Sequence, residues 1–113
     1  MRNCFTKFGE TAVTDGINKE LPNKLINFIF NTVILDIDYP KDYLQVIEIV
    51  KENNKTILKI KQEDVNDIIK AHETKRTLEN GVVPENILNR KIYLIEDDYI
   101  DYKVQTLLFA NEY

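Results

Sequence analysis

The sequence is poor in the residues on which many enzymes and disulfide-bonded proteins depend. Its 113 residues include one cysteine, Cys4, one histidine, His72, three glycines and no tryptophan. A lone cysteine cannot form an intrachain disulfide, and a zinc site of histidines and cysteines needs three or four such ligands. A Cys–His nucleophilic pair would require Cys4 to lie beside His72, and no pattern brings them together. We therefore expect no catalytic residues, cofactor or metal, with Cys4 as a small buried hydrophobe.

Phosphate-binding loops and membrane-length apolar runs are missing as well. Neither G-x-G-x-x-G nor G-x-x-x-x-G-K-[ST] occurs, which excludes nucleotide hydrolysis of the P-loop type. The most apolar window, 25–37, is interrupted by Asn27, Asn31 and Asp36 and falls short of the roughly 20 residues of a bilayer span. It predicts a core helix. Since no signal-peptide hydrophobic region follows Met1, we expect a cytoplasmic protein without membrane contact.

Positive charge is not in excess. Fifteen Lys and Arg against 19 Asp and Glu give a net charge of −4, which makes general nucleic-acid binding unfavourable. A local basic patch is still conceivable at Lys51, Lys55, Lys59 and Lys61, which fall within one segment. The simpler explanation is a solvated face that guards a sheet edge.

The strongest structural signal is residues 42–63, two β-rich runs joined at Asn53-Asn54. Asparagine tolerates the positive φ angles of a two-residue type I′ loop, so this segment predicts a β-hairpin. The loop fixes which residues face each other across the strands. The predicted core-side pairs are Ile49 with Leu58, Ile47 with Ile60 and Gln45 with Gln62, and the predicted outer pairs are Glu48 with Lys59 and Val46 with Lys61. Gln45 and Gln62 are expected to hydrogen-bond inside the fold.

One helix is expected before this hairpin and one after it. An extended segment over 4–14 should stop at a turn at Asp15-Gly16. A first helix should follow Pro22 and end before Tyr39-Pro40. Its apolar residues recur at helical spacing: Leu25, Ile26, Ile29, Phe30, Val33 and Ile34. A second amphipathic helix is predicted from Val65 through Ile68, Ile69 and His72, closed by Asn80-Gly81.

The C-terminal third predicts a short helical turn from Pro84 to Leu88 and then a second hairpin. Its strands should cover 91–96 and 100–109 around an acidic turn. The expected architecture is a single α+β domain over 1–113, a mostly antiparallel sheet of about five strands packed with two main helices. Free sheet edges and the apolar first helix would also allow a homodimer.

Carboxylates and tyrosines supply the remaining candidate sites. Asp36 with Asp38, and the run Glu96-Asp97-Asp98 with Asp101, offer oxygen ligands of the kind that Mg²⁺ or Ca²⁺ accepts, although turn geometry and solvation explain them more simply. Tyrosine buries a ring while its hydroxyl stays wet, which suits a surface that meets a protein. The candidate partner contacts are Tyr39, Tyr43, Tyr99, Tyr102, Asp98 and Asp101.

Five blocks carry a resemblance to a known family: VTDGINKELP (13–22), DYLQVIEI (42–49), KIKQE (59–63), KIYLIEDD (91–98) and TLLFANEY (106–113). In this order they resemble the blocks of an uncharacterised domain-of-unknown-function family, number nine-sixty, found in Firmicutes and their phages and mobile elements. The resemblance implies a small cytoplasmic protein of prophage or mobile-element origin, and it transfers no catalytic residue.

Three functional hypotheses stay open. The preferred one is a non-enzymatic accessory protein that binds a bacterial or phage protein stoichiometrically, as a regulator or an anti-defence inhibitor. The second is a nucleic-acid-associated module that uses the Lys51–Lys61 face. The third is a carboxylate metal-dependent enzyme.

Overall fold

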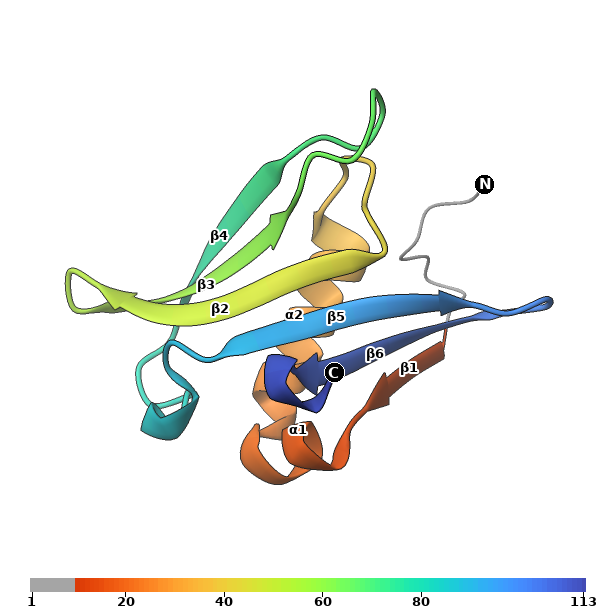
Figure 1. Ribbon diagram of the computed structural model, residues 1–113. Coiled ribbons are helices and arrows are strands. Elements are labelled where there is room, and N and C mark those ends of the chain that lie inside the picture. The colour runs from red at the N-terminus through yellow and green to blue at the C-terminus, as the bar shows by residue number, and fades with distance from the viewer. Residues whose placement is uncertain (1–9) are drawn as a thin grey trace.

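The computed structural model describes residues 10–113 as one α+β domain with a six-stranded mixed sheet (Figure 1). The strand order is β1-β6-β5-β2-β3-β4; β1 runs parallel to β6 and the other neighbours are antiparallel. The strands are β1 (Glu10–Val13), β2 (Leu44–Glu52), β3 (Lys55–Gln62), β4 (His72–Leu78), β5 (Lys91–Asp98) and β6 (Lys103–Phe109). Cys4 and the first part of the predicted 4–14 extended segment lie outside the described residues.

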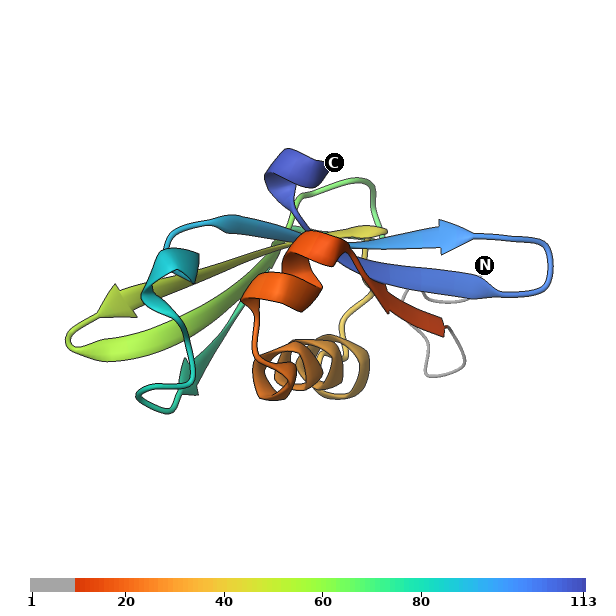
Figure 2. The ribbon, with the colours of Figure 1, turned by 90° about the horizontal axis from the view of Figure 1, so that it is seen from below.

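One face of the sheet is covered by helices and the other is largely open (Figure 2). Helices α1 (Asp15–Glu20) and α2 (Asn23–Asn31) and the π-helical turn η1 (Thr32–Asp36) lie between β1 and β2 in the chain. The short 3₁₀ turns are η2 (Glu85–Ile87) and η3 (Ala110–Glu112), and η3 lies on the side of the sheet opposite α2. No helix among the described residues is long and apolar enough to cross a membrane.

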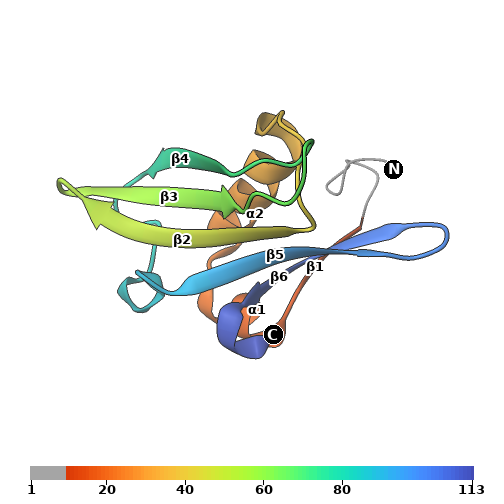
Figure 3. The ribbon, with the colours of Figure 1, turned by 45° about the horizontal axis from the view of Figure 1, so that its top comes forward.

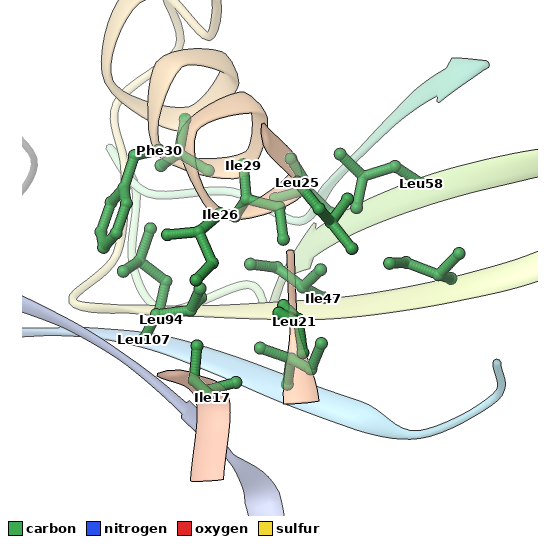
Figure 4. Close-up of a cluster of buried hydrophobic side chains, with 14 of the residues drawn as sticks. Ile17, Leu21, Leu25, Ile26, Ile29, Phe30, Ile47, Leu58, Leu94 and Leu107 are labelled. Atoms are coloured by element: carbon green, nitrogen blue, oxygen red, sulfur yellow. The ribbon is translucent and has the colours of Figure 1, made fainter. Parts of the chain in front are cut away.

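The hydrophobic core lies between α2 and the inner face of the sheet (Figure 4). Leu25 and Ile29 of α2 are fully buried, because helical spacing places them on the face that meets the sheet. They meet alternate residues of the central strands, such as Ile47, Leu58 and Leu94. Their burial provides the main driving force for folding, at roughly 1.5–3 kcal/mol for each large side chain.

The β2–β3 hairpin forms as the sequence predicts. Asn53 and Asn54 have φ angles of 52° and 66°, as a type I′ loop requires. Ile47 pairs with Ile60, Ile49 with Leu58, Glu48 with Lys59 and Val46 with Lys61. The predicted contact between Gln45 and Gln62 is also present, since Gln45 Nε2 donates a 2.8 Å hydrogen bond to Gln62 Oε1.

The predicted helix from Val65 to His72 is wrong. Val65 and Ile68 are exposed in a loop, where the Asn66 side chain accepts hydrogen bonds from the backbone N–H groups of Ile68 and Ile69. The chain then forms β4, because the outer edge of β3 offers a full ladder of hydrogen bonds, which stabilises a strand more than one short apolar stripe stabilises a helix. Gly81, with φ of 83°, closes a turn after a strand instead of a helix.

Smaller differences from the expected architecture have local causes. Asp15-Gly16 does not form the predicted turn. Instead α1 begins at Asp15, because the Thr14 hydroxyl accepts a hydrogen bond from Ile17 N and caps the helix. The helix after Pro22, the short turn after Pro84 and the second hairpin are present. The sheet has a sixth strand because β4 replaces the second predicted helix.

Candidate protein-binding surface

The outer face of the sheet, opposite the helices, divides into a charged half and an aromatic half. The charged half lies on β2, β3 and β4, where Lys59 Nζ is 2.9 Å and Lys75 Nζ is 3.9 Å from the carboxylate of Glu52. The hydrogen bond to Lys59 is the main reason that the pKa of Glu52 is lowered. Positive charge in this half is therefore partly neutralised within the chain.

The four lysines of the predicted basic patch do not share one surface. Strand alternation places Lys55, Lys59 and Lys61 on the outer face, whereas Lys51 pairs with Thr56, which is buried on the helix side. A strand whose residues alternate between faces cannot present all its lysines to one ligand. The patch as predicted from sequence is thus divided by the sheet.

The aromatic half lies over β5 and β6 and contains a shallow hollow of about 230 Å³. The ring of Tyr93 meets the ring of Tyr113 edge to face, with 5.8 Å between centroids. Tyr113 reaches this face because η3 turns the chain back over the sheet (Figure 2). The residues that line this aromatic hollow are Tyr43, Ile95, Asp97, Thr106, Leu108 and Tyr113.

The turn between β5 and β6, residues 99–102, forms a second exposed apolar feature, the hairpin tip. This hairpin projects beyond the rest of the sheet (Figures 1 and 3). Tyr99 and Tyr102 stack with centroids 5.0 Å apart, and Tyr99 N donates a 2.8 Å hydrogen bond to Tyr102 O. Ile100, which follows Tyr99 in the sequence, is fully exposed, and Asp101 is exposed as well. The tip is therefore an ordered turn that presents rings and an aliphatic side chain to solvent.

The acidic run 96–98 is divided between the two faces of the sheet, because successive residues of a strand point to opposite faces. Glu96 lies on the helix side, where its carboxylate is 2.8 Å from Lys103 Nζ and both side chains are 2% exposed. Burial raises the pKa of Glu96, and hydrogen bonds from Lys103 and Gln105 oppose that rise. Asp98 lies 3.5 Å from the same amine, and Asp97 lines the aromatic hollow on the other face. Within residues 10–113, no group of three or more His, Cys, Asp or Glu side chains could hold a metal ion.

Sequence reasoning missed this buried ion pair, although strand alternation contained the signal. Lys103 and Gln105 share a strand face with Leu107 and Phe109, which are buried in the core. A lysine at such a position needs a carboxylate partner. The facing strand supplies it at Glu96.

The predicted tyrosine contacts fall in three places. Tyr43 borders the aromatic hollow, and Tyr99 and Tyr102 form the hairpin tip together with Asp101. Tyr39 lies apart from them: its ring stacks on that of His72, with centroids 3.9 Å apart. His72 is an exposed residue at the start of β4 and does not lie on an apolar helix face.

The remaining predicted contact, Asp98, faces Lys103. The hollow also includes Ile95, Leu108 and Tyr113, which sequence reasoning did not select.

Fold and surface together define a small single-domain α+β protein whose mixed sheet carries helices on one face. No family model matches the sequence, and no curated protein sequence matches it. The structure is similar to the crystal structure of a protein of unknown function from Enterococcus faecalis, with a TM-score of 0.78 and 19% identity. The similarity covers 100% of this chain and 98% of that chain. At this identity the similarity shows a shared fold and does not extend to activity.

Proposed function

We propose that this chain is a non-enzymatic accessory protein that binds one protein partner stoichiometrically through the hairpin tip and the aromatic hollow. The observation that carries the proposal is the complete exposure of Ile100 in a turn whose tyrosines, Tyr99 and Tyr102, stack on each other. The resemblance to family nine-sixty supports a phage or mobile-element origin and action in the cytoplasm, as a regulator or an anti-defence inhibitor.

The energetics of the hairpin tip favour binding to a protein. An isoleucine in water contributes nothing to the core of its own chain, whereas its burial against a partner is worth roughly 1.5–3 kcal/mol. The turn is already held by the backbone hydrogen bond between Tyr99 and Tyr102, so binding would order few additional groups. Rigid exposed tyrosines are typical of residues that dominate protein–protein affinity.

Charge defines the chemistry of the partner. Asp101 lies at the tip and Asp97 borders the aromatic hollow, so carboxylates flank both apolar features. The chain as a whole carries a net charge of −4. A basic protein surface with an apolar centre would complement this arrangement and would be attracted to it over several ångströms. Nucleic acid is a poorer fit, because no lysine or arginine of the described part of the chain lies in the tip or lines the hollow.

The test compares capture of a partner by the wild type with capture by Ile100→Ser. The wild type should retain one host or phage protein with a basic contact surface, and Ile100→Ser should weaken that complex about tenfold or more. Ile68→Ser is the matched control, because Ile68 is also an exposed isoleucine, 71% exposed, in the loop between β3 and β4. Failure to retain any protein, or equal retention by Ile100→Ser, would overturn the proposal.

A second pair of variants tests the aromatic hollow. Asp97→Asn removes the charge without changing the shape of the side chain and should weaken binding mainly at low ionic strength. Tyr113→Ala removes a wall of the hollow and should weaken binding at all ionic strengths. Binding that is unaffected by both changes would exclude the hollow and restrict the contact to the hairpin tip.

A further inference from the structure

The outer edge of β4 is the second notable surface of the molecule, at the end of the sheet remote from β1 (Figure 3). Among the described residues this edge has no strand partner. The strand has seven residues, and the side chains of Glu73, Lys75 and Thr77, on the outer face of the sheet, are exposed. An edge of this length with unpaired backbone groups is able to pair with another strand.

The direction of the backbone groups of β4 follows from the hairpin geometry. In a two-residue hairpin the residues flanking the loop, Glu52 and Lys55, form a hydrogen-bonded pair, and hydrogen-bonded pairs alternate along the ladder. Ile49 O points away from β3, since it accepts a 2.8 Å hydrogen bond from Asn89 N. The backbone N–H and C=O groups of Leu58, which faces Ile49, therefore also point away from the β2–β3 ladder, and they bond with Arg76 in β4.

The same alternation leaves the backbone groups of Glu73, Lys75 and Thr77 directed away from the sheet. One contact supports this assignment independently: the Arg76 side chain reaches back to donate a 2.9 Å hydrogen bond to Lys75 O. That carbonyl has no strand partner among the described residues, so the molecule satisfies it with its own guanidinium. This contact is exposed and can be exchanged for a strand.

We propose that β4 pairs antiparallel with β4 of a second copy of this chain, forming a two-fold symmetric dimer with one continuous sheet. A two-fold axis perpendicular to the sheet requires facing residues to come from the same face. The register that places Thr74 opposite Thr74 of the second copy meets this condition. It also places Glu73 opposite Lys75 of the second copy, and symmetry repeats that opposite-charge pair.

Charge selects this register over its neighbours. A shift in one direction would place Lys75 opposite Lys75 of the second copy, and a shift in the other would place Glu73 opposite Glu73. Like charges directly opposite each other destabilise a sheet, whereas each opposite-charge pair contributes roughly 0.2–1 kcal/mol. The selected register also brings together the outward backbone groups of Glu73 and Lys75, so each pair can exchange two backbone hydrogen bonds.

The proposed dimer leaves the hairpin tip free. The β5–β6 hairpin projects from the opposite side of the molecule, so the tip and the β4 edge do not compete (Figure 1). Because a single edge strand is a small interface, we expect a weak dimer, with a Kd of about 10 µM or weaker.

Sedimentation equilibrium on the full chain tests this inference with charge variants. Glu73→Lys and Lys75→Glu should each weaken the dimer about tenfold, because each creates like-charge pairs at the interface. The double variant that swaps the two charges should recover most of the wild-type affinity. Lys91→Glu is the control, since Lys91 is exposed on β5, away from this edge.

A backbone variant provides an independent measurement. Lys75→Pro removes an N–H that the assignment directs outward, so it should abolish the dimer while β4 stays in its own sheet. Circular dichroism and thermal melting establish that each variant is folded. A wild type that stays monomeric at about 1 mM would overturn the proposal. A dimer whose affinity is unchanged by the charge swap series would overturn it equally.

Discussion

The carboxylate of Glu112 accepts a 2.7 Å hydrogen bond from the hydroxyl of Thr14, which joins the C-terminal turn to the start of α1. Glu112 also accepts hydrogen bonds from Phe109 N, at 2.9 Å, and Gly16 N, at 3.3 Å. These N–H groups favour the charged form, and the hydrogen bond from Phe109 is the main reason that the pKa of Glu112 is lowered. The block TLLFANEY thus has a structural role at its glutamate.

Glu112→Gln should lower stability at neutral pH by an amount that decreases in acid. A carboxyl whose pKa is lower in the folded state stabilises the fold above its unfolded value, near 4.5, and that stability is lost as the pH falls through the folded pKa. Thermal melts of both proteins from pH 7 to pH 3 measure the difference. Glu63→Gln, at an exposed position, is the control for the loss of one charge. A difference that is constant with pH would contradict the role of the charge.

Gly16→Ala should lower the stability of the wild type and raise the stability of a Glu112→Ala variant. A Cβ at Gly16 would lie 2.6 Å from Glu112 Oε2, so in the wild type the carboxylate must move and lose its contacts with α1. In a Glu112→Ala background the space is open, and alanine should stabilise the helix by up to about 1 kcal/mol relative to glycine. Urea unfolding of the wild type, the two single variants and the double variant gives the coupling free energy between positions 16 and 112. Equal effects of Gly16→Ala in both backgrounds would contradict the prediction.

Gln62→Leu should be more destabilising than Gln45→Leu. The Gln62 amide donates to Pro40 O and Lys70 O and accepts from Asp42 N, so it holds two loops to the end of the hairpin. Leucine would remove the partner of each of these part-buried backbone groups, at a cost of roughly 1–3 kcal/mol for each group that water cannot reach.

Gln45 makes fewer hydrogen bonds than Gln62, because its buried Oε1 has no hydrogen-bond partner among residues 10–113. Leucine at position 45 removes that unsatisfied oxygen and loses only the two bonds made by Nε2, to Asp42 O and Gln62 Oε1. Denaturant unfolding ranks the two variants, and hydrogen exchange at Asp42 N should accelerate only in Gln62→Leu. A larger loss in Gln45→Leu would show that the ranking is wrong.

Lys103→Met should be among the most destabilising single changes in the chain. It leaves the Glu96 carboxylate buried without the amine at 2.8 Å, and breaking a buried pair in this way costs about 3–5 kcal/mol. Replacing both partners, Glu96→Leu with Lys103→Met, should recover most of that loss, because neither charge then remains to be solvated. Unfolding free energies of the single and double variants decide this, and a double variant as unstable as Lys103→Met would contradict it.

Glu96 and Glu112 should affect the pH dependence of stability with opposite signs. Burial raises the pKa of Glu96, so the folded protein binds its proton more tightly than the unfolded chain does. The wild type should therefore lose stability relative to Glu96→Gln as the pH rises from below 4.5 through the folded pKa. Melting temperatures over the same pH range measure this trend, and the reverse trend would show that the ion pair outweighs burial.

Much of the fold could be predicted from local sequence, and the candidate surface only in part. Asn53-Asn54 fixes the hairpin register because asparagine accepts positive φ, and this register alone places Gln45 beside Gln62. Tyr99 falls in the predicted turn between two β-rich runs, so its exposure at the hairpin tip was predictable, whereas Tyr102 was expected inside the strand 100–109, which begins only at Lys103. The aromatic hollow was not, since Tyr113 reaches it only through the 3₁₀ turn after β6.

The sequence by itself determined the α2 core stripe and both hairpins, because these depend on spacing, turn chemistry and strand alternation within short segments. Only the tertiary structure decided the rest. Residues 72–78 became a strand because the edge of β3 was available, a partner that the local pattern of Val65 to His72 does not contain. Lys103 is buried because Glu96 faces that side of the sheet from the neighbouring strand, and desolvation makes each of these charges depend on the other.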